Sequence, residues 1–431
     1  MKTLRIGLLG FGQIGSGLYS LISEKADFFA RDLGVRLEIC KIAVKNKNKK
    51  RKLRIPKSLL ATDAHEVIKD PSIDVIVELI GGIREAKEYV MESLRHGKHV
   101  ITANKALLAE EGDEIFELAN QVKRWILFEA SVGGGIPIIK SLREGLVANH
   151  IESIHGIING TSNYILSRMS EEKSSFADAL KEAQEKGYAE ADPTLDIEGV
   201  DAAHKLAILI RFACGGKVRF KDIYCEGISS ILSEDISFAE EFGYRIKLLA
   251  IAKSSKDGIE ARVQPTLLPK SHILANVNGS FNAVLLRGDK VGDVLLYGRG
   301  AGAAPTASAV MSDLIDIVMR ETARFDEDSA GMRAIRKQLK IKNISSILSR
   351  YYLRFHVVDK PGVLSKISNV LGRQGISISD VIQKEWSVGS VVPLILLTHD
   401  AHERNVRNAI RLIDKLDIIR GKSQVIRIET D

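Results

Sequence analysis

The 431-residue chain is poor in cysteine, and the three that it has are Cys40, Cys214 and Cys225. So sparse and odd a set supplies neither a disulfide framework nor the spacing of a zinc site, so we expect plain buried thiols in a reducing, cytoplasmic environment. The chain also lacks any uncharged apolar run of about 18 residues, which excludes a transmembrane helix. The N-terminus enters a strand pattern at once, and we expect no signal peptide.

Aromatic residues are scarce, at 6% of the chain, and excess positive charge is confined to one place. Residues 45–54 contain seven lysines and arginines and no acid, whereas the rest of the chain balances 55 basic against 55 acidic residues. A nucleic-acid-binding surface would need a wider basic field with interleaved aromatics, so we exclude it. With 45% hydrophobic residues the chain can bury real cores, and its length predicts two to four domains.

A dinucleotide-binding pattern opens the sequence. Residues 4–9 are a short apolar run with a β-branched residue, which predicts a buried strand, and a helical pattern begins at residue 16. Between them lies a G-x-G-x-x-G motif, whose glycines permit a tight turn, the approach of a pyrophosphate and close packing of helix on strand. We therefore predict that cofactor phosphates bind at Gly10, Phe11, Gly12, Gln13, Ile14 and Gly15.

The second predicted strand, residues 36–44, ends at a basic loop. An enzyme specific for NAD would place an Asp or Glu there to bond the ribose 2′-hydroxyl. This loop has Lys45, Asn46 and Lys47 instead, and no carboxylate before Asp63. The 2′-phosphate of NADP suits such a loop by charge, so we predict NADP as the preferred cofactor and NAD as the second. The alternative is a solvated surface loop.

Strand and helix patterns then alternate, with further strands predicted at 73–80, 99–103 and 125–130. This order predicts an α/β fold with a Rossmann-type, doubly wound and mostly parallel sheet. Ligands bind beyond the carboxyl ends of such strands. Polar or glycine-rich segments stand at three of these ends, namely 78–82, 102–105 and 129–135, and together they favour a cofactor cleft.

The chemistry of the second half is concentrated between Gly187 and Lys205. A helix is predicted at 136–147, and the run of residues 159–163 ends the following strand and caps a helix predicted at 164–169. The segment 187–205 is dense in carboxylates, and its Asp201 and Lys205 share a face of a predicted helix because they lie four residues apart. The rest of that helix is apolar, which favours a binding site over the alternative of a surface ion pair.

The remaining patterns suggest how the chain is divided. Residues 263–269 and 281–298 predict strands with a hairpin at Gly288-Asp289, and the helix after Gly302 should pack back on the nucleotide-binding part. From residue 351 the order is βαββαβ, a ferredoxin-like unit. We therefore expect a nucleotide-binding domain at 1–135 joined by 303–321, an α+β catalytic and dimerisation domain at 136–302, a linker at 322–350 and a regulatory domain at 351–431.

The pattern A-x3-G-Y-A-x2-D-P-x2-D-I-x-G-x-D-x3-K, from Ala183 to Lys205, resembles the signature of homoserine dehydrogenases. The runs TANK at 102–105, EASVGGGIP at 129–137, NGT at 159–161 and GRGAGAAPTASAV at 298–310 are similar to that family in order and spacing. The resemblance implies reversible reduction of L-aspartate 4-semialdehyde to L-homoserine by NAD(P)H. Because no aspartokinase-like segment is present, we expect a monofunctional enzyme.

The resemblance also implies roles for single residues. Lys205 would give the proton to the nascent alkoxide, with Lys105 as the alternative acid or a positioning group in the same site. Glu190 and Asp201 would hold the substrate through its ammonium. An acid beside the carbonyl oxygen is the main requirement, because the cofactor carries the hydride. Further cofactor contacts are expected at Thr102, Lys105, Gly187 and Gly302.

The family also has a monovalent cation, usually sodium, near the position of Glu129. The matching carbonyls here belong to Val132, Gly134 and Ile136. A hard cation prefers oxygen ligands, which a glycine-rich bend can supply. The alternative is a simple turn with no metal.

The C-terminal unit, with D-x-P-G-V-L at 359–364, resembles an ACT domain, a module that binds amino acids at domain interfaces. The resemblance implies a regulatory site at Asp359, Gly362, Val363 and Leu364, with threonine as the effector, in a homodimer or homotetramer. An assembly domain without ligand is the alternative, because fold alone does not define function.

Two other classes of function compete with this interpretation. The first is another NAD(P)-dependent amino-acid oxidoreductase, but one that forms an acyl phosphate would want a nucleophilic cysteine, and none of the three cysteines sits in such a motif. A catalytically silent amino-acid sensor would show a broken set of Lys, Asp and Glu residues, and that set is intact. We expect a small-molecule substrate and neither nucleic acid nor membrane as partner.

Overall fold

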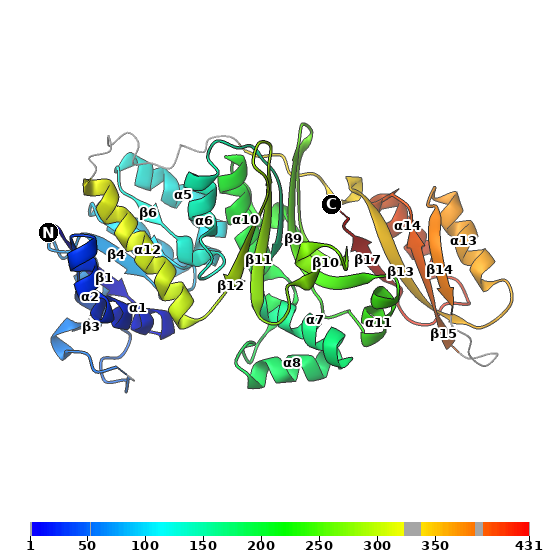
Figure 1. Ribbon diagram of the computed structural model, residues 1–431, viewed down its shortest axis with the longest axis horizontal. Helices are drawn as coiled ribbons and strands as arrows, with labels where there is room; N and C mark the ends of the chain where they lie inside the picture. Colours follow the sequence, from blue (N-terminus) through cyan, green and yellow to red (C-terminus); the bar gives the residue numbers. More distant parts are fainter. Residues whose placement is uncertain (1, 52, 323–337, 384–390, 431) are drawn as a thin grey trace. The chain divides into compact units, whose positions relative to one another are not determined.

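The computed structural model describes residues 2–51, 53–322, 338–383 and 391–430, and Figure 1 traces their ribbon. The chain forms two compact units, each assembled from separate stretches of sequence. In the described ranges, no helix has the length and apolar character needed to cross a membrane. The first unit comprises residues 1–151, 204–221 and 282–339, and the second comprises 152–203, 222–281 and 340–431.

A six-stranded parallel sheet forms the centre of the first unit. Its spatial order is β3-β2-β1-β4-β5-β6, so the chain builds outward from β1 to one side and then to the other. This is the order of a doubly wound nucleotide-binding sheet and confirms the predicted Rossmann-type fold. The strands are β1 (Lys2–Leu9), β2 (Val35–Ala43), β3 (Leu60–Ala61), β4 (Val75–Glu78), β5 (His99–Thr102) and β6 (Ile126–Leu127).

Helix α12 (Ala303–Thr322) joins the core of this sheet although it lies far along the chain. It packs beside α1 (Gln13–Glu24), as Figure 1 shows, and its Val310 and Leu314 enter the same buried cluster as Leu8. The prediction that this helix returns to the nucleotide-binding part is confirmed. The other helices of the first unit are α2 (Ala26–Asp32), α3 (Ala64–Ile68), α4 (Arg84–Arg95), α5 (Lys105–Gln121), α6 (Ile138–Lys140) and, from residue 204 onward, α10 (Val200–Cys214).

The strand predicted over 125–130 is wrong in length, since only Ile126–Leu127 pairs with the sheet. The chain turns directly afterwards, because the Glu129 N–H donates to Asp313 Oδ2 at 2.9 Å and a 3₁₀ turn begins. The helix predicted over 136–147 is also shorter, with α6 followed by one π-helical turn at Ser141–Gly145.

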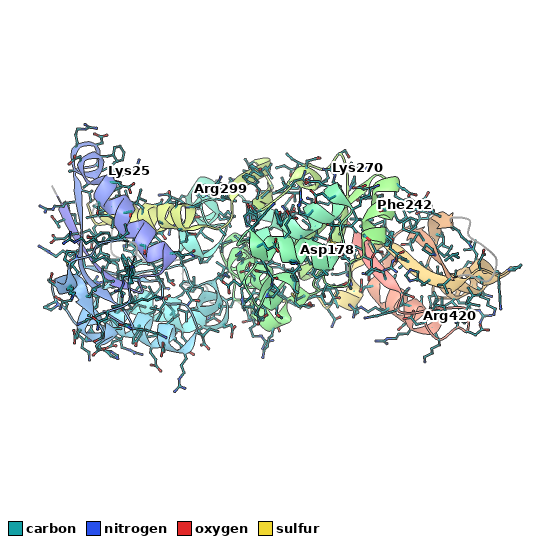
Figure 2. All side chains as sticks on the ribbon, turned by 90° about the horizontal axis from the view of Figure 1, so that it is seen from below. Lys25, Asp178, Phe242, Lys270, Arg299 and Arg420 are labelled. Carbon is teal, nitrogen blue, oxygen red and sulfur yellow. The ribbon has the colours of Figure 1, made fainter. Side chains whose placement is uncertain are left out.

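The single helix predicted after the glycine motif is interrupted. Lys25, labelled in Figure 2, has φ −109° and ψ 14°, outside the helical region, and separates α1 from α2. The hairpin predicted at Gly288-Asp289 is confirmed by β11 (Phe281–Gly288) and β12 (Gly292–Arg299). Short 3₁₀ turns complete the described chain at Lys57–Leu59, Phe220–Asp222, Ile273–Asn276 and Ile344–Ser346.

The second unit begins with a long antiparallel hairpin, β9 (Tyr244–Ser255) and β10 (Gly258–Pro269), beside β7 (Ile151–Ile157). Asn159 lies just before α7 (Gly160–Glu172), and its Oδ1 accepts the Ser162 N–H at 2.8 Å. A cap within the 159–163 run is thus confirmed, but the helix begins at Gly160 rather than at Tyr164 and takes in the rest of that run. The remaining elements of this part are α8 (Phe176–Glu185), α9 (Thr194–Ile197), β8 (Tyr224–Cys225) and α11 (Ser233–Glu241).

The C-terminal part of the second unit has the predicted βαββαβ order. Its main strands lie in the spatial order β17-β13-β15-β14, which is that of a ferredoxin-like sheet. Both helices pack on one apolar cluster that includes Ile367, Leu371 and Ile413. The elements are β13 (Leu348–Val358), α13 (Val363–Arg373), β14 (Ile378–Gln383), β15 (Val391–Thr398), β16 (Ala401–His402), α14 (Glu403–Ile413) and β17 (Gln424–Ile428).

The C-terminal part is continuous with the rest of the second unit, because β17 pairs in parallel with β10. Buried ion pairs accompany this joint. Arg427 donates to Glu226 at 2.8 Å, and Arg354 forms a bidentate pair with the fully buried Asp235 at 2.7 and 3.1 Å. The 322–350 linker predicted from the sequence falls partly outside the described residues, at 323–337.

Candidate active site

The glycine-rich turn between β1 and α1 combines tight packing with open space. A Cβ on Gly10, which has φ +95°, would lie 2.7 Å from the Leu79 carbonyl oxygen, and one on Gly15 would lie 2.7 Å from the Gly10 carbonyl oxygen. Gly12, the N-cap of α1, would bring its Cβ within 4 Å of no atom. The open position leaves the N-terminal amides of α1 accessible to an anion.

The side chains of Phe11, Gln13 and Ile14 do not fill the open space beside Gly12. Phe11 and Ile14 pack against the core of the first unit, and Gln13 is exposed. The Gly10 N–H donates to the Ala43 carbonyl at 3.0 Å, which fixes the turn against the carboxyl end of β2. The loop that follows β2 therefore begins beside the glycine turn.

That basic loop is held by its own arginine. Lys45 and Lys47 are exposed, whereas the Arg51 guanidinium folds back on the loop and donates to the Asn46 carbonyl at 2.7 Å and to the Lys47 carbonyl at 3.1 Å. The bonds of Arg51 go to main-chain oxygens, so they order the loop without neutralising its charge. The sequence alone gave Arg51 no role of its own.

The carboxyl ends of β4 and β5 are joined by a buried hydrogen-bond network. Glu78 is fully buried, and its carboxylate accepts the Ile80 N–H at 2.8 Å and the Thr102 hydroxyl at 2.6 Å. Asn104 then caps α5 by accepting the Leu107 N–H. This network sets the start of α5, where Lys105 is the first residue and is half-buried.

Glu129 organises the bend that was predicted to hold a cation. Its two carboxylate oxygens accept the Ile139 and Lys140 N–H groups at 2.9 and 2.7 Å. Burial raises the pKa of Glu129, and that of the neighbouring Asp313, because the charged forms lose water. The carboxylate is thus committed to main-chain amides, so a cation at this bend would depend on backbone carbonyls.

The predicted carbonyl ligands lie in this same bend. Val132 and Ile136 are buried, and Gly134 has φ +56°. The Ile136 carbonyl already accepts the Ile138 N–H at 2.8 Å. No group of three or more His, Cys, Asp or Glu side chains suited to a metal ion occurs among the described residues.

Asn159 organises the 187–205 segment, which was predicted to contact the substrate. Helix α10 carries Asp201 and Lys205, both buried, one turn apart on one face. The Asn159 side-chain amide donates to Asp201 Oδ2 at 2.9 Å and to Asp196 Oδ1 at 2.7 Å. The structure thus brings together two carboxylates of the 187–205 segment. Asp196 was not among the predicted site residues, although it stands inside the D-I-x-G signature.

Glu190 lies in the exposed turn that follows α8. Gly187 ends that helix with φ +73°, and the Tyr188 carbonyl accepts the Thr161 hydroxyl at 2.7 Å. The Gln184 side chain donates to the Glu190 carbonyl at 3.2 Å, so the main chain is held while the Glu190 side chain is exposed to solvent. An exposed carboxylate on a fixed turn is available to a ligand.

The two other predicted sites are glycine turns before helices. Gly302 has φ +119° and directly precedes α12. Gly362, the N-cap of α13, has φ +89°, with Asp359 half-buried and Leu364 exposed nearby. The Val363 side chain packs in the core of the C-terminal sheet, so it can offer a ligand only its main chain.

The cysteines are free and half-buried rather than fully buried. Burial raises the pKa of Cys214 and of Cys225 to about 11. Neither thiol is therefore disposed to act as a nucleophile at neutral pH.

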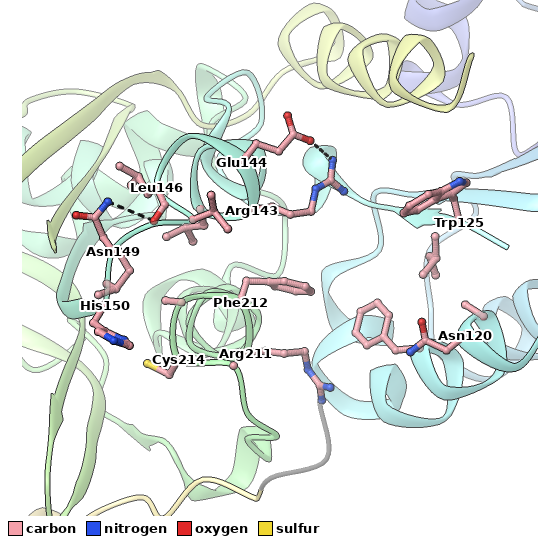
Figure 3. A pocket seen from close by; sticks show the side chains of 18 of the residues that line it. Asn120, Trp125, Arg143, Glu144, Leu146, Asn149, His150, Arg211, Phe212 and Cys214 are labelled. Carbon is pink, nitrogen blue, oxygen red and sulfur yellow. Dashed lines mark hydrogen bonds and ion pairs between the residues drawn. The ribbon is translucent and has the colours of Figure 1, made fainter. Parts of the chain in front are cut away.

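The first unit also contains a cavity of about 470 Å³, shown in Figure 3. Phe212 projects between Arg143 and Arg211, and the described lining residues include none of the predicted site residues. Arg143 pairs with Asp316 at 2.6 Å, and Arg211 pairs with Asp113. Because these arginines already neutralise nearby carboxylates, we assign the cavity no role in the reaction.

Comparison with protein families gives three consecutive matches. Residues 10–129 match the homoserine dehydrogenase NAD-binding domain, residues 137–315 match homoserine dehydrogenase, and residues 351–417 match the ACT domain. The homoserine dehydrogenase of Neisseria gonorrhoeae is 47% identical over 433 residues, covering 100% of this chain and 99% of that protein. That of Pseudomonas aeruginosa is 44% identical, with the same coverage.

Solved structures agree with these matches. A homoserine dehydrogenase from Thiobacillus denitrificans has a TM-score of 0.93 at 47% identity, covering 99% of this chain and 98% of that one. A hyperthermophilic archaeal homoserine dehydrogenase in complex with NADPH has a TM-score of 0.62 at 28% identity, covering 75% of this chain and 98% of that one.

A doubly wound sheet with an open glycine turn, followed by a region that matches homoserine dehydrogenase and by an ACT domain, defines an NAD(P)-binding oxidoreductase with a C-terminal ACT domain. The 47% sequence identity over the whole chain identifies the family of this oxidoreductase. The chain belongs to the homoserine dehydrogenase family.

Proposed function

We propose that the protein catalyses the reversible reduction of L-aspartate 4-semialdehyde to L-homoserine by NAD(P)H, as a step in threonine and methionine biosynthesis. The observation that carries this proposal is the buried pair of Asp201 and Lys205 on one helix face, tied through Asn159 to Asp196. This is the segment in which the family signature lies. The bound nicotinamide supplies the hydride in one direction and accepts it in the other.

Lys205 is proposed as the general acid. Reduction of the aldehyde creates an alkoxide, and a buried ammonium beside it can transfer a proton as the charge develops. In the reverse direction the neutral amine takes the proton of the homoserine hydroxyl. Lys105, at the start of α5, is the alternative acid or a positioning group.

The substrate ammonium is proposed to bind the carboxylates. Asp201 is buried and fixed by Asn159, and Glu190 is presented on a fixed turn. A buried carboxylate binds an ammonium more strongly than an exposed one, because little water competes. Asp201 is therefore expected to contribute more to homoserine affinity than Glu190.

The test is direct oxidation of L-homoserine by the purified chain with NADP+ and, separately, with NAD+, followed by the absorbance of the reduced nicotinamide. Turnover that requires L-homoserine supports the proposal. Turnover with another amino-acid alcohol or aldehyde, and none with homoserine, overturns it.

NADP is the proposed preferred cofactor. The exposed Lys45 and Lys47 follow the strand that the glycine turn contacts, and Arg51 orders their loop. Replacing both lysines by alanine should raise KM for NADP+ far more than KM for NAD+, because only NADP+ carries the 2′-phosphate. Equal changes for both cofactors would mean that the loop is solvated surface.

A sodium ion is proposed at the bend after Glu129, on the carbonyls of Val132, Gly134 and Ile136. The bend fits in part, since it is buried and rich in carbonyls, but one of these carbonyls already accepts an N–H group. Loss of activity when sodium is replaced by a large organic cation would support the site.

The C-terminal part is proposed to bind threonine and to inhibit the enzyme in a homodimer or homotetramer. Gly362 opens the N-terminus of α13, an 11-residue helix, to a carboxylate, with Asp359 near enough in sequence to meet an ammonium. The proposal includes the domain division expected from the sequence, in which the regulatory domain begins at residue 351. An enzyme that ignores millimolar threonine and other aspartate-derived amino acids would overturn it.

A further inference from the structure

The short strand β8 and the turn after it, residues 224–229, support the chain that leads into α10. The Ile228 N–H donates to the Ile197 carbonyl at 2.8 Å. The approach is close, because a Cβ added to Gly227 would lie 2.4 Å from the Ile197 carbonyl oxygen. The 224–229 segment and the residues just before α10 therefore cannot shift independently of each other.

Two side chains strengthen this contact at Glu198, which stands three residues before Asp201. The Ser229 hydroxyl donates to Glu198 Oε1 at 2.8 Å, and the Cys225 thiol donates to the Glu198 carbonyl at 3.2 Å. Asp201 is buried in the first turn of α10, and it is the carboxylate to which we assign the substrate ammonium. The place of the 224–229 segment thus bears on the place of Asp201.

The same segment contacts the C-terminal part through Glu226. Its carboxylate accepts hydrogen bonds from the Arg427 guanidinium of β17 at 2.8 Å and from the Tyr224 hydroxyl at 2.7 Å. Arg427 also donates two bonds to Glu403, the first residue of α14, at 2.5 and 2.8 Å. One arginine therefore joins a helix of the C-terminal part to the segment that supports the start of α10.

We propose that Glu226 is a positioning residue through which an effector in the C-terminal part changes the affinity for the substrate. This inference rests on the proposed function, with threonine at the start of α13 and the substrate ammonium at Asp201. Helices α13 and α14 share one apolar cluster that includes Leu371 and Ile413. Because packed cores shift as bodies rather than deform, a ligand that moves α13 moves α14 and Glu403 with it.

Arg427 should follow Glu403 rather than Glu226 in such a movement. The Arg427 and Glu403 side chains are 4% and 2% exposed, whereas the Glu226 side chain is 27% exposed. Separating a fully buried ion pair is more costly than stretching one that water reaches. A displacement of α14 therefore acts on the single bond to Glu226 and, through it, on the 224–229 segment. The expected result is a changed affinity for L-homoserine.

Glu226→Ala removes this link and leaves the buried ion pair of the C-terminal part in place. Glu182→Ala is the matched control. The Glu182 side chain is 26% exposed and, like that of Glu226, accepts bonds from a tyrosine and an arginine, here Tyr164 and Arg168 at 2.9 Å each. Both of these partners lie in α7, so the contact joins α8 to α7.

The experiment measures, in the full-length protein, the Kd of L-homoserine with and without saturating threonine. Calorimetry in the presence of NADPH serves for this, because the reduced cofactor cannot oxidise homoserine. In the wild type we expect threonine to raise that Kd about 5- to 150-fold, the usual range of allosteric coupling. Homoserine should raise the Kd of threonine by the same factor, since coupling between two binding sites is reciprocal.

In Glu226→Ala both factors should fall below about 2-fold, while the Kd of threonine alone stays within about 2-fold of wild type. Glu182→Ala should keep the wild-type factors. Glu226→Gln, compared with Glu182→Gln, is the milder second variant, and its factors should lie between those of Glu226→Ala and the wild type, because glutamine keeps an acceptor and loses the charge. A residue that only supports the fold would change the Kd of homoserine and not the factor by which threonine changes it.

The outcomes are distinguishable. A full wild-type factor in Glu226→Ala, or in Glu226→Gln should the alanine variant not fold, overturns the role of Glu226, as does an equal loss in Glu182→Ala. Threonine that lowers kcat without changing the Kd of homoserine overturns it too, because the proposed link acts on binding. A wild type that does not respond to threonine refutes the proposed regulation and this inference with it, whereas a wild type that does not oxidise homoserine refutes the proposed reaction.

Discussion

The glycine turn of the nucleotide-binding sheet and the 187–205 segment, proposed to bind the substrate, are built from different chemical groups. At the glycine turn, the features that matter are main-chain atoms and the absence of side chains, as the open Cβ position of Gly12 shows. In the 187–205 segment, side chains hold side chains, and Asn159 ties Asp196 to Asp201. A site made of main chain is sensitive to added atoms, whereas a site made of side chains is sensitive to lost ones. Substitutions can test this difference directly.

The largest effect on activity is expected in the 187–205 segment, from Lys205→Ala. Loss of a general acid should lower kcat by about 10²–10⁴-fold. The cofactor should still bind, because the glycine turn does not depend on this side chain, and titration of nicotinamide fluorescence measures that. Lys105→Ala is the control. If Lys205→Ala keeps kcat within a few-fold of wild type and Lys105→Ala does not, the acid is Lys105.

The next largest effect concerns stability at the joint between β10 and β17. Arg427 has a 4% exposed side chain and pairs with Glu403 at 2.5 Å and with Glu226 at 2.8 Å. Arg427→Met should lower the free energy of unfolding by about 3–5 kcal/mol, because both carboxylates lose a buried partner.

The matched control for this joint is Arg420→Met. Arg420, labelled in Figure 2, is exposed and donates to main-chain carbonyls of Asp417 and Ile419. Its loss should cost less than about 0.5 kcal/mol, as is usual for exposed positions. Urea denaturation of both variants measures the difference, and equal losses would show that the joint is not held by its ion pairs.

The glycine turn, where main-chain atoms form the proposed cofactor site, can be tested at two glycines with opposite surroundings. Gly10→Ala adds a methyl group 2.7 Å from a carbonyl oxygen at φ +95°, so it should destabilise the free protein by about 1–2 kcal/mol or more. Gly12→Ala adds a methyl group in open space, so the free protein should melt unchanged. Its Kd for the cofactor should nevertheless rise about 10-fold or more, since that space is proposed for the pyrophosphate. Tight cofactor binding by Gly12→Ala would contradict this assignment.

The smallest effect is expected on the way the stability of the protein changes with pH. Burial, with the nearby Arg245 as a second cause, lowers the pKa of Lys247 to about 7, against an ordinary 10.5. Between pH 7 and pH 10.5 the unfolded chain binds a proton at Lys247 that the folded chain does not. The contribution of Lys247 to the free energy of unfolding therefore rises with pH across that window and does not change with pH below it.

Lys247→Met should remove this slope. Melting temperatures recorded from pH 7 to 10 should therefore rise less in the variant than in the wild type. Lys270→Met is the control, because Lys270, labelled in Figure 2, is exposed. Parallel curves for Lys247→Met and wild type would show that the buried amine does not titrate in that range.

The sequence predicts the nucleotide-binding end well because the residues that form it lie close together in the sequence. Gly10, Gly12 and Gly15 lie within six residues of one another, and their roles follow from spacing and from the strand and helix that flank them. The strand–helix alternation likewise predicts the doubly wound sheet. By contrast, the predicted strand at 125–130 is cut short by Asp313, whose bond to the Glu129 N–H spans 184 residues. No local pattern can reveal such a partner.

The substrate segment shows the same limit. The spacing of Asp201 and Lys205 follows from helical periodicity, but the contact of Asn159 with Asp196 and Asp201 spans 37 and 42 residues. From the sequence, Asn159 belongs to a run predicted to cap a helix, and its contacts with the two carboxylates are not foreseen. The sequence predicts the 263–269 half of β10 but leaves β9 unassigned, and it does not reveal that β10 pairs with β17 and so joins the C-terminal part to the sheet.

The placement of β17 has a consequence for how the chain emerges from the ribosome. Strand β10 is complete long before its neighbour exists, and Arg427 meets Glu226 only after 201 further residues have been made. During that interval β10 is paired with β9 and β8, and only the short stretch at Thr266 and Leu267 lacks its strand partner, which leaves a small edge able to pair with other nascent chains. We expect a holding chaperone to cover this short edge until the last strand arrives.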